Sequence, residues 1–348
     1  MALTIRNRAV TAVSGALAAA VLAAIAATST GAATLPAAPR PAAGRGPGAV
    51  AAHAAARTTR AQSAAGQYWT PARMAAAVPA DALAVTAPQT AARPSAASRE
   101  AWLDGNSLGA GLRWAHGGAV QRTLGKVFFT LNGMNYVCSG AAIKSPRAEM
   151  VLTAAHCAND GDGHWAANWT FVPGYAGGGE PYGSYTARRF YVPARWSGAT
   201  DGSAQSEEYD VAFVTVNPAA LSGTPTGARA DQLTGGQAVA FGSAPAGGFP
   251  AYVFGYPSEP PYSGQYANYC AGQALPASPG GTAQLHCGMT AGDSGGPWFA
   301  DFNPRTGTGT IVAVTTYKFS DDSSVLYGTE LGAGARALYD EASASPAG

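Results

Sequence analysis

Charged residues are scarce in this chain, at only 12% of its 348 residues, compared with roughly 25% in an average soluble protein. The formal net charge is +1, so the overall balance gives no support to nucleic-acid binding. The 45 glycines and 24 prolines argue against a helical bundle or a coiled coil. With 47% hydrophobic residues, the chain can still bury a sizeable core.

The few charges are distributed unevenly. Residues 1–99 contain nine arginines and a single acidic residue, Asp81. Residues 100–348 contain twelve basic and nineteen acidic residues. A basic first third and an acidic remainder indicate that the chain consists of two parts with different roles.

Long apolar runs are absent except at the N-terminus. Arg6 and Arg8 precede an apolar stretch over residues 9–27, and small residues follow it. This order is typical of a secretory signal peptide, which we place at residues 1–33. A transmembrane anchor is the alternative, but alanine dominates the stretch and polar residues dilute it. We therefore expect a secreted, extracellular protein with no membrane attachment after signal cleavage.

Cysteine is also rare, and the four cysteines are Cys138, Cys157, Cys270 and Cys287. No two of them have the spacing of a zinc site, and no ligand spacing supports calcium, so we expect no metal and no cofactor. An even number of cysteines in an exported chain indicates disulfides. Of the three possible pairings, proximity in the sequence favours Cys138–Cys157 and Cys270–Cys287.

Large apolar residues are sparse from about residue 34 to residue 98, where Ala, Pro, Arg, Thr and Ser dominate. Such a composition cannot bury enough surface to offset the entropy of ordering. We interpret residues 34–113 as a basic, Ala/Pro-rich pro-segment that is largely disordered, and residues 114–348 as the folded domain. The exception is an aromatic island, Tyr68–Met74, that could dock on the remainder.

Helix-period patterns are nearly absent after this segment, whereas short β-rich runs bounded by Gly, Pro, Asn or Asp recur. The runs are 126–131, 136–138, 150–153, 170–172, 211–216, 238–241, 251–256 and 310–316. Strands at this spacing predict an all-β sandwich or barrel. One helix of any length is expected, at the C-terminal end, over Ala333–Ala342.

Three short motifs carry reactive side chains. The first places His156 between an apolar run and a half-cystine, and the second places Asp210 at the start of an apolar strand. The third, Gly-Asp-Ser-Gly-Gly-Pro, surrounds Ser294 with glycines. A serine hydroxyl becomes a nucleophile when a base removes its proton, and histidine has a suitable pKa near neutral pH. A buried carboxylate needs a partner, and glycines let the amides of Gly292 and Ser294 point at one developing oxyanion. The set suits acyl transfer.

These motifs, in the order His, Asp, Ser, resemble those of the chymotrypsin/trypsin family of serine endopeptidases, and its bacterial secreted branch in particular. The resemblance covers about residues 118–339 and implies two six-stranded antiparallel β-barrels with the active site between them. It implies His156 as general base, Asp210 as its orienting acid and Ser294 as the nucleophile that forms an acyl-enzyme. It also implies Gly292 and Ser294 as the oxyanion hole, and a protein or peptide substrate. We expect a monomer.

The resemblance also locates a substrate pocket, with departures from the family pattern. Its expected residues are Gly288, Met289, Thr290, Thr315, Thr316 and Tyr317. Trypsin-like enzymes carry an Asp at the position of Gly288, so cleavage after Lys or Arg is not expected. An uncharged side chain before the scissile bond is expected, because an ion without a partner is costly there. The alternative is an acidic side chain bound by hydroxyls and His286.

In the family, a freed α-ammonium pairs with the Asp before the nucleophile, which is Asp293 here. We therefore expect a zymogen from which residues 34–113 are removed, so that the mature chain starts near Trp114. A cut after Arg122 is a second possibility. Some bacterial relatives use an internal arginine instead, and then no defined cut is needed.

Two other interpretations fit the sequence less well. A catalytically inactive protease-fold binding protein would usually lack a triad residue, and a cell-wall structural protein would need repeats or an anchor motif. Asp201 is a rival to Asp210 but lies in a Ser/Gly/Ala stretch typical of an exposed loop. His116, His164 and His286 have no motif around them and are interpreted as structural or surface residues.

Overall fold

A computed structural model describes residues 48–80, 109–147, 149–196, 207–221, 224–225, 228–242, 244–277, 281–319 and 322–345. All of them belong to one compact unit, residues 42–348. The expected signal peptide, residues 1–33, and the rival acid Asp201 lie outside the described residues. Within the described ranges, no helix combines the length and apolar character that a membrane span needs.

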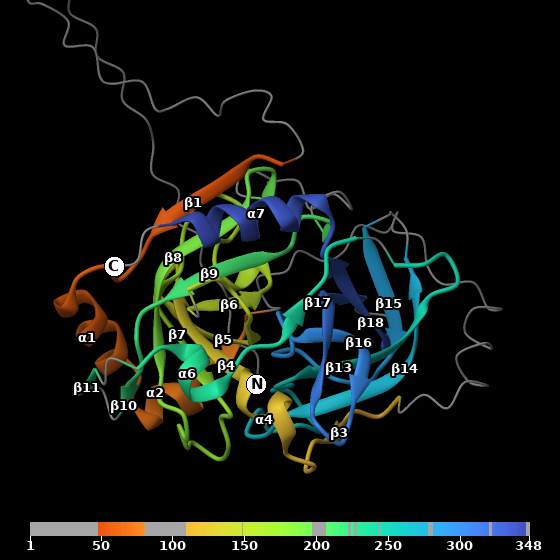
Figure 1. Ribbon diagram of the computed structural model, residues 1–348. Helices are drawn as coiled ribbons and strands as arrows, with labels where there is room; N and C mark the ends of the chain where they lie inside the picture. The colour runs from red at the N-terminus through yellow and green to blue at the C-terminus, as the bar shows by residue number, and fades with distance from the viewer. Residues whose placement is uncertain are drawn as a thin grey trace, which may run out of the picture. The chain divides into compact units, whose positions relative to one another are not determined.

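The first half of the domain forms a closed antiparallel barrel of six strands (Figure 1, yellow to green). The strands are β4 (Leu124–Leu131), β5 (Met134–Ile143), β6 (Met150–Thr153), β7 (Ala167–Pro173), β8 (Tyr185–Pro193) and β9 (Ala212–Val216). Pairing of β8 with β9 closes the ring. Both faces of β4 are covered, which explains why all its residues but Thr130 are buried. Val127 and Phe129 face the barrel interior, whereas Leu124 and Phe128 face a second cluster outside it.

The second half forms a matching barrel (Figure 1, blue). Its strands are β13 (Phe249–Gly255), β14 (Asn268–Pro276), β15 (Thr282–His286), β16 (Pro297–Asn303), β17 (Thr308–Phe319) and β18 (Asp322–Glu330). Pairing of β17 with β18 closes this ring. The predicted pair of six-stranded barrels is confirmed, as is the C-terminal helix, α7 (Ala333–Ala344).

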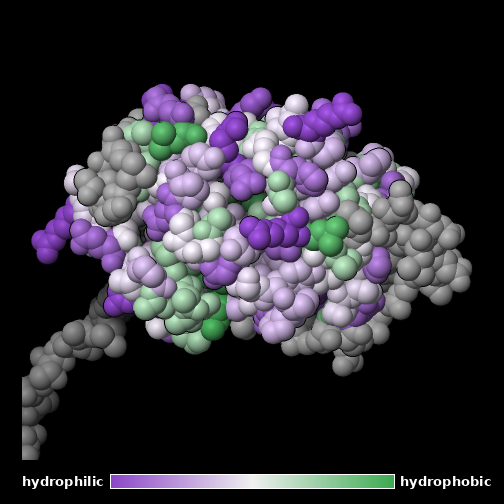
Figure 2. Space-filling model, turned by 90° about the horizontal axis from the view of Figure 1, so that it is seen from below, coloured by the Kyte–Doolittle hydropathy of each residue, from purple (hydrophilic) through white to green (hydrophobic). Residues whose placement is uncertain are grey.

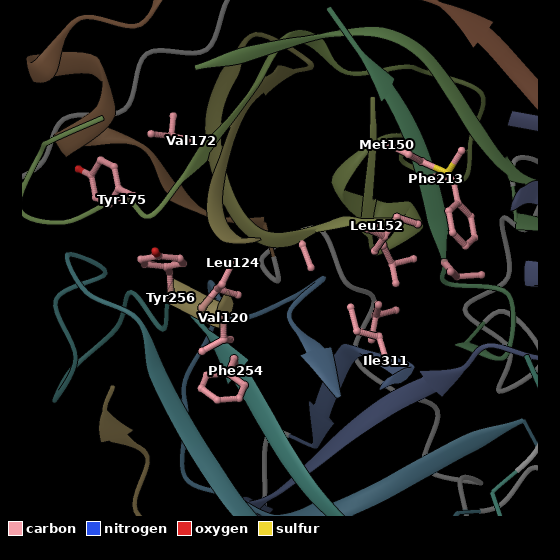
Figure 3. Close-up of a cluster of buried hydrophobic side chains, with 14 of the residues drawn as sticks. Val120, Leu124, Met150, Leu152, Val172, Tyr175, Phe213, Phe254, Tyr256 and Ile311 are labelled. Atoms are coloured by element: carbon pink, nitrogen blue, oxygen red, sulfur yellow. The ribbon is translucent and has the colours of Figure 1, made fainter. Parts of the chain in front are cut away.

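A hydrophobic cluster joins the two barrels. Leu152 and Phe213 of the first barrel contribute to the same cluster as Phe254 and Ile311 of the second (Figure 3). Each barrel also has its own interior cluster. The loops that carry the predicted catalytic residues leave the barrels beside this shared cluster.

Smaller elements complete the fold. They are β3 (Leu112–Arg113), α4 (Gly118–Thr123), η2 (Ala155–Cys157), β10 (Ala220–Leu221), β11 (Thr224–Pro225), α6 (Ala230–Thr234) and β12 (Ala238–Val239). β3 pairs with β14, and β12 pairs with β17.

Residues 48–80, which lie within the expected pro-segment, are folded. They form β1 (Val50–Ala54), α1 (Thr59–Tyr68), α2 (Pro71–Ala76) and β2 (Val78–Pro79). β1 extends the first barrel by pairing antiparallel with β8, and β2 pairs with β5. We call residues 48–80 the docked segment.

The aromatic island explains why the docked segment is ordered. Trp69 is 6% exposed, its ring centroid lies 5.4 Å from that of Phe128, and its indole N–H donates to the Asn168 carbonyl at 2.6 Å. Met74 is buried as well. Thr58 and Thr70 cap the two short helices through their hydroxyl oxygens. Main-chain pairing and two large anchors therefore hold a segment whose average composition is typical of disorder.

Candidate active site

His156 lies in a short turn whose position is fixed from both sides. Strand β6 ends at Thr153, and a single 3-10 turn then carries the imidazole. The next residue, Cys157, forms a disulfide with Cys138 of β5, as proximity in the sequence predicted. His156 itself is only 3% exposed.

Asp210 contacts His156 at two points. The Nδ1 atom of His156 lies 2.7 Å from Asp210 Oδ2, and its backbone N–H donates to Asp210 Oδ1 at 2.9 Å. Both residues are buried. An Nδ1–H that donates to the carboxylate leaves the lone pair on Nε2, which is the tautomer a general base needs. The carboxylate therefore sets both the orientation and the protonation pattern of the ring.

Ser294 lies in a tight turn packed against the His156 turn. Gly292 and Gly295 have φ of +101° and +79°, which side chains rarely tolerate. A Cβ on Gly295 would lie 2.1 Å from Thr153 Oγ1 and 2.4 Å from the Ser139 carbonyl. The carbonyl of Ser294 accepts from the Ser139 amide at 2.7 Å. The nucleophile candidate and the His156 turn are therefore neighbours across the two barrels.

Ser139 was missed by the sequence reasoning. The Ser139 amide binds Ser294, and the Ser139 hydroxyl makes two further hydrogen bonds. It donates to the Gly292 carbonyl at 2.9 Å and accepts from the Tyr256 amide at 2.8 Å. Its own carbonyl accepts from the Thr153 hydroxyl. Ser139 thus connects the end of β6, just before the His156 turn, through its carbonyl with the glycine expected to donate to the oxyanion through its hydroxyl. The neighbouring half-cystine, Cys138, was the one signal that could have indicated this position.

Asp293, the expected activation partner, is 2% exposed and directly precedes Ser294. Burial raises the pKa of the Tyr262 hydroxyl, and the charge of Asp293 adds to this rise. Tyr262 also hydrogen-bonds to the backbone of Gly111. The Tyr262 side chain therefore lies between Asp293 and Gly111, which is just ahead of the expected mature start.

The first half of the expected pocket lies against that same stretch. The Gly288 amide donates to the Gly109 carbonyl at 2.5 Å, and a Cβ on Gly111 would lie 2.5 Å from Met289 Cγ. The His286 ring also contacts Gly109, where a Cβ would lie 2.4 Å from Cε1. Residues 109–111 thus contact Gly288 and Met289, two of the six residues expected to bind substrate.

The remaining expected pocket residues are held by other contacts. Thr290 exchanges hydrogen bonds with the backbone of Glu259. Thr315 Oγ1 accepts from the Trp298 indole at 3.0 Å, and Thr316 is buried. Tyr317 stacks on Tyr327, with ring centroids 4.7 Å apart. Thr315, Thr316 and Tyr317 lie on β17, and Thr290 lies in the loop before Ser294. Each of the four side chains is buried or bonded to neighbouring protein groups.

Two charged residues near this region were not predicted. Lys318 donates to the Cys287 carbonyl at 2.7 Å, next to Gly288. Burial raises the pKa of the Glu207 carboxyl to about 7; contact with the Tyr317 hydroxyl opposes the rise, and the Asp210 charge adds to it. Neither residue belongs to a recognisable motif, because each acts through a contact between distant parts of the sequence.

Two of the histidines outside the motifs contact neighbouring side chains and take no part in the candidate active site. His116 packs on Trp114, with ring centroids 4.8 Å apart, and His164 pairs with Asp160 at 2.7 Å. The second predicted disulfide, Cys270–Cys287, is also present.

Metal binding finds no support at the site. In the part of the chain that the structure describes, the one cluster of three possible ligands is Cys138, His156 and Cys157. Both cysteines are joined in a disulfide, so neither offers the thiolate that binds a metal ion.

Comparison with known proteins agrees with this geometry. A family model described as a trypsin-like peptidase domain matches residues 138–305. The crystal structure of protease Anisep from Arthrobacter nicotinovorans is 35% identical and covers 67% of this chain and 99% of its own, with a TM-score of 0.58. The chain belongs to the trypsin-like serine proteases.

A second solved structure agrees on the family, and a curated protein matches a short stretch. The thermostable serine protease AL20 from an extremophilic microorganism is 32% identical over 66% of this serine protease and 100% of its own chain, with a TM-score of 0.57. An 82-residue stretch is 32% identical to the extracellular metalloprotease of Bacillus subtilis (strain 168). That stretch spans 24% of the curated relative. The present chain is thus a serine endopeptidase that hydrolyses peptide bonds.

Proposed function

We propose that this protease cleaves peptide bonds through a triad of Ser294, His156 and Asp210. The His156 Nε2 atom takes the proton of the Ser294 hydroxyl as Oγ attacks the substrate carbonyl. The amides of Gly292 and Ser294 stabilise the oxyanion of the tetrahedral intermediate. The imidazolium then gives its proton to the leaving amine, and the acyl-enzyme on Ser294 remains. Water repeats the sequence and releases the second product.

The observation that carries this proposal is the two-point contact between His156 and Asp210. A carboxylate that binds both the ring Nδ1 and the backbone N–H of the same residue fixes the base in one tautomer and stabilises its protonated form. Labelling with a fluorophosphonate tests the nucleophile. The active protein should be modified at Ser294, and the Ser294→Ala variant should take up no label and show no hydrolysis. Label on a different serine would overturn the assignment.

We infer that the protein is exported and that its precursor is activated by a cut ahead of the protease domain. Two disulfides support an oxidising compartment. Ser294 is fully buried in this chain, which is consistent with a site that opens when the chain is cut. The two relatives of known structure correspond to about two thirds of this chain, the share taken by residues 114–348.

Of the two candidate cuts, the geometry favours the one after Arg113. Arg113 is exposed on the two-residue strand β3, whereas Arg122 lies in α4 with its guanidinium bonded to the Thr234 carbonyl. Trp114 packs edge-on against Phe254 and Tyr269, which would anchor a new N-terminus. The freed α-ammonium would then pair with Asp293. N-terminal sequencing of the secreted, active protein tests this, and a start near residue 34 would exclude it.

For specificity, an uncharged residue before the scissile bond remains our first proposal, because Gly288 supplies no charge. An acidic residue is the second candidate, and Lys318 is the observation that favours it. A peptide library separates them. A preference for Asp or Glu that disappears in Lys318→Met would establish the second, and a dominant Lys or Arg preference would exclude both.

We further propose that the enzyme acts as a monomer. On the face shown in Figure 2, strongly hydrophobic residues form small separate spots among hydrophilic ones. A sedimentation measurement tests this proposal, and a concentration-dependent dimer would contradict it.

A further inference from the structure

Lys126 is a buried cation in an unusual position. It lies on β4 of the first barrel and is 4% exposed. Among the described residues, no carboxylate lies within salt-bridge distance of its ammonium group. Burying an ammonium ion without a carboxylate is costly, so an apolar side chain would be the cheaper choice for packing alone.

The ammonium group of Lys126 reaches across to the second barrel. Its Nζ donates to the Gly264 carbonyl at 2.9 Å and lies 3.4 Å from the Ser258 hydroxyl oxygen. Both acceptors belong to the loop Tyr256–Gly264, which follows β13 and which we call the bracing loop. The Gly264 amide donates back to the Pro257 carbonyl at 2.8 Å. One cation thus holds both ends of the bracing loop.

The bracing loop is bonded in turn to the loop that precedes Ser294. The Ser258 amide donates to the Ala291 carbonyl at 2.7 Å. The Glu259 amide donates to Thr290 Oγ1 at 3.2 Å, and the Thr290 hydroxyl donates to the Glu259 carbonyl at 2.9 Å. Three hydrogen bonds therefore connect the two loops immediately before Gly292.

Gly292 is confined between Ser258 and Ser139. A Cβ at this glycine would lie 2.7 Å from Ser258 Oγ, and on the other side Ser139 donates to its carbonyl. Ser139 lies directly opposite Lys126 in the pairing of β4 with β5. Two facing residues of the first barrel therefore hold the same turn of the second.

We propose that Lys126 is a positioning residue for the oxyanion hole, and that its charge fixes the bracing loop and thereby the peptide that precedes Gly292. This rests on the proposed role of the Gly292 amide in catalysis. A charged donor makes a stronger hydrogen bond than a neutral one, which suits a contact that must hold a loop between two barrels. An oxyanion donor displaced by a fraction of an ångström loses much of its effect.

The surroundings of the ammonium group are consistent with a retained charge. The rings of Phe128 and Tyr175 lie 5.5 and 5.4 Å from Nζ, and such faces attract cations. Tyr175 contacts Tyr256 (Figure 3), and burial raises the pKa of both hydroxyls, so they stay neutral. Burial lowers the pKa of Lys126 itself to about 8. The contact is therefore charged at neutral pH and weakens in mild alkali.

Lys126→Met tests the proposal in the secreted, active protein, because methionine keeps the apolar stem and removes the charge. We expect kcat to fall about tenfold while KM stays within twofold. The component of the alkaline decline of kcat that has its midpoint near pH 8 should be absent in the variant. Lys126→Arg should restore part of kcat, and the exposed Lys144→Met is the matched control that should change nothing.

A measurement that needs no activity accompanies the kinetics. Hydrogen exchange of the peptides that cover 256–264 and 289–294 should accelerate at least tenfold in Lys126→Met, with no change around His156. Ser258→Ala should reproduce the effect on 289–294. If the wild type proves inactive, the proposed triad fails, but exchange still decides the role of Lys126. Unchanged exchange in 289–294, or a fall of kcat that is accompanied by global unfolding, would overturn the proposal.

Discussion

The docked segment should unfold locally when its main anchor is removed. Trp69 is 6% exposed and donates to the Asn168 carbonyl. Replacing a buried Trp by Ala typically costs about 3–5 kcal/mol, and the Asn168 carbonyl loses its donor as well. A loss of about 3 kcal/mol raises the population of the undocked state roughly 100-fold, since each 1.4 kcal/mol is a factor of ten.

Hydrogen exchange in the inactive Ser294→Ala background measures this opening directly, without processing of the chain. The amides of Gln62 and Met74 bond within the two short helices and report on α1 and α2 separately. In Trp69→Ala we expect their protection to fall about 100-fold, and strand β6 should keep its protection. The exposed Arg60→Ala is the control and should leave both amides unchanged. If Gln62 and Met74 are unprotected in the parent protein, or if Trp69→Ala changes them less than threefold, the docking argument is wrong.

Three further results are expected. Glu207→Gln should gain stability relative to the parent as pH rises from about 4.5 to 7, because burial raises the pKa of the Glu207 carboxyl to about 7 and its ionisation destabilises the folded state. Urea denaturation should show a difference in unfolding free energy of about 2–3 kcal/mol at pH 8 and none at pH 4. The opposite trend would refute this. Removing the Cys138–Cys157 bridge, whose cysteines are 19 residues apart, should cost about 3 kcal/mol and lower kcat through His156; denaturation curves that coincide with the parent's would contradict this. Gly295→Ala should abolish hydrolysis because its Cβ would lie 2.1 Å from Thr153 Oγ1. Gly133 has a similar φ of +82° but open space around it, so Gly133→Ala should keep nearly full activity. Equal losses of activity in the two variants would show that backbone strain alone is responsible.

The sequence predicted strands best where β-branched and aromatic residues run together. The run 150–153 coincides with β6, and 211–216 agrees with β9 within one residue. Five barrel strands lie outside the predicted runs: β8, β14, β15, β16 and β18. Glycine, alanine, glutamine and serine fill much of β14 and β18, and two arginines interrupt β8. Those strands are held by main-chain pairing with neighbouring strands, and the residue types of a single strand do not report that pairing.

The same distinction applies to the active site. The proposed triad of His156, Asp210 and Ser294 comes from motifs that are each local in sequence, and the structure brings two of its members, His156 and Asp210, into contact. Lys126 and Ser139 were not predicted, since their importance comes from contacts between the two barrels. For the docked segment, average composition gave no sign of order, whereas the aromatic island that contains Trp69 did indicate docking.

The pairing of β1 with β8 has a consequence for the processed enzyme. Arg189–Pro193 of β8 pair with residues 50–54, and the neighbouring amides of Ala55 and Ala56 continue the ladder. If processing released the docked segment, these main-chain groups would form an open sheet edge, and such an edge recruits any extended peptide that meets it. A protease that loses β1 would therefore gain a second place where peptides bind as strands, on the outside of the first barrel and without a nucleophile. Inhibitors or partners shaped as single strands would find it there.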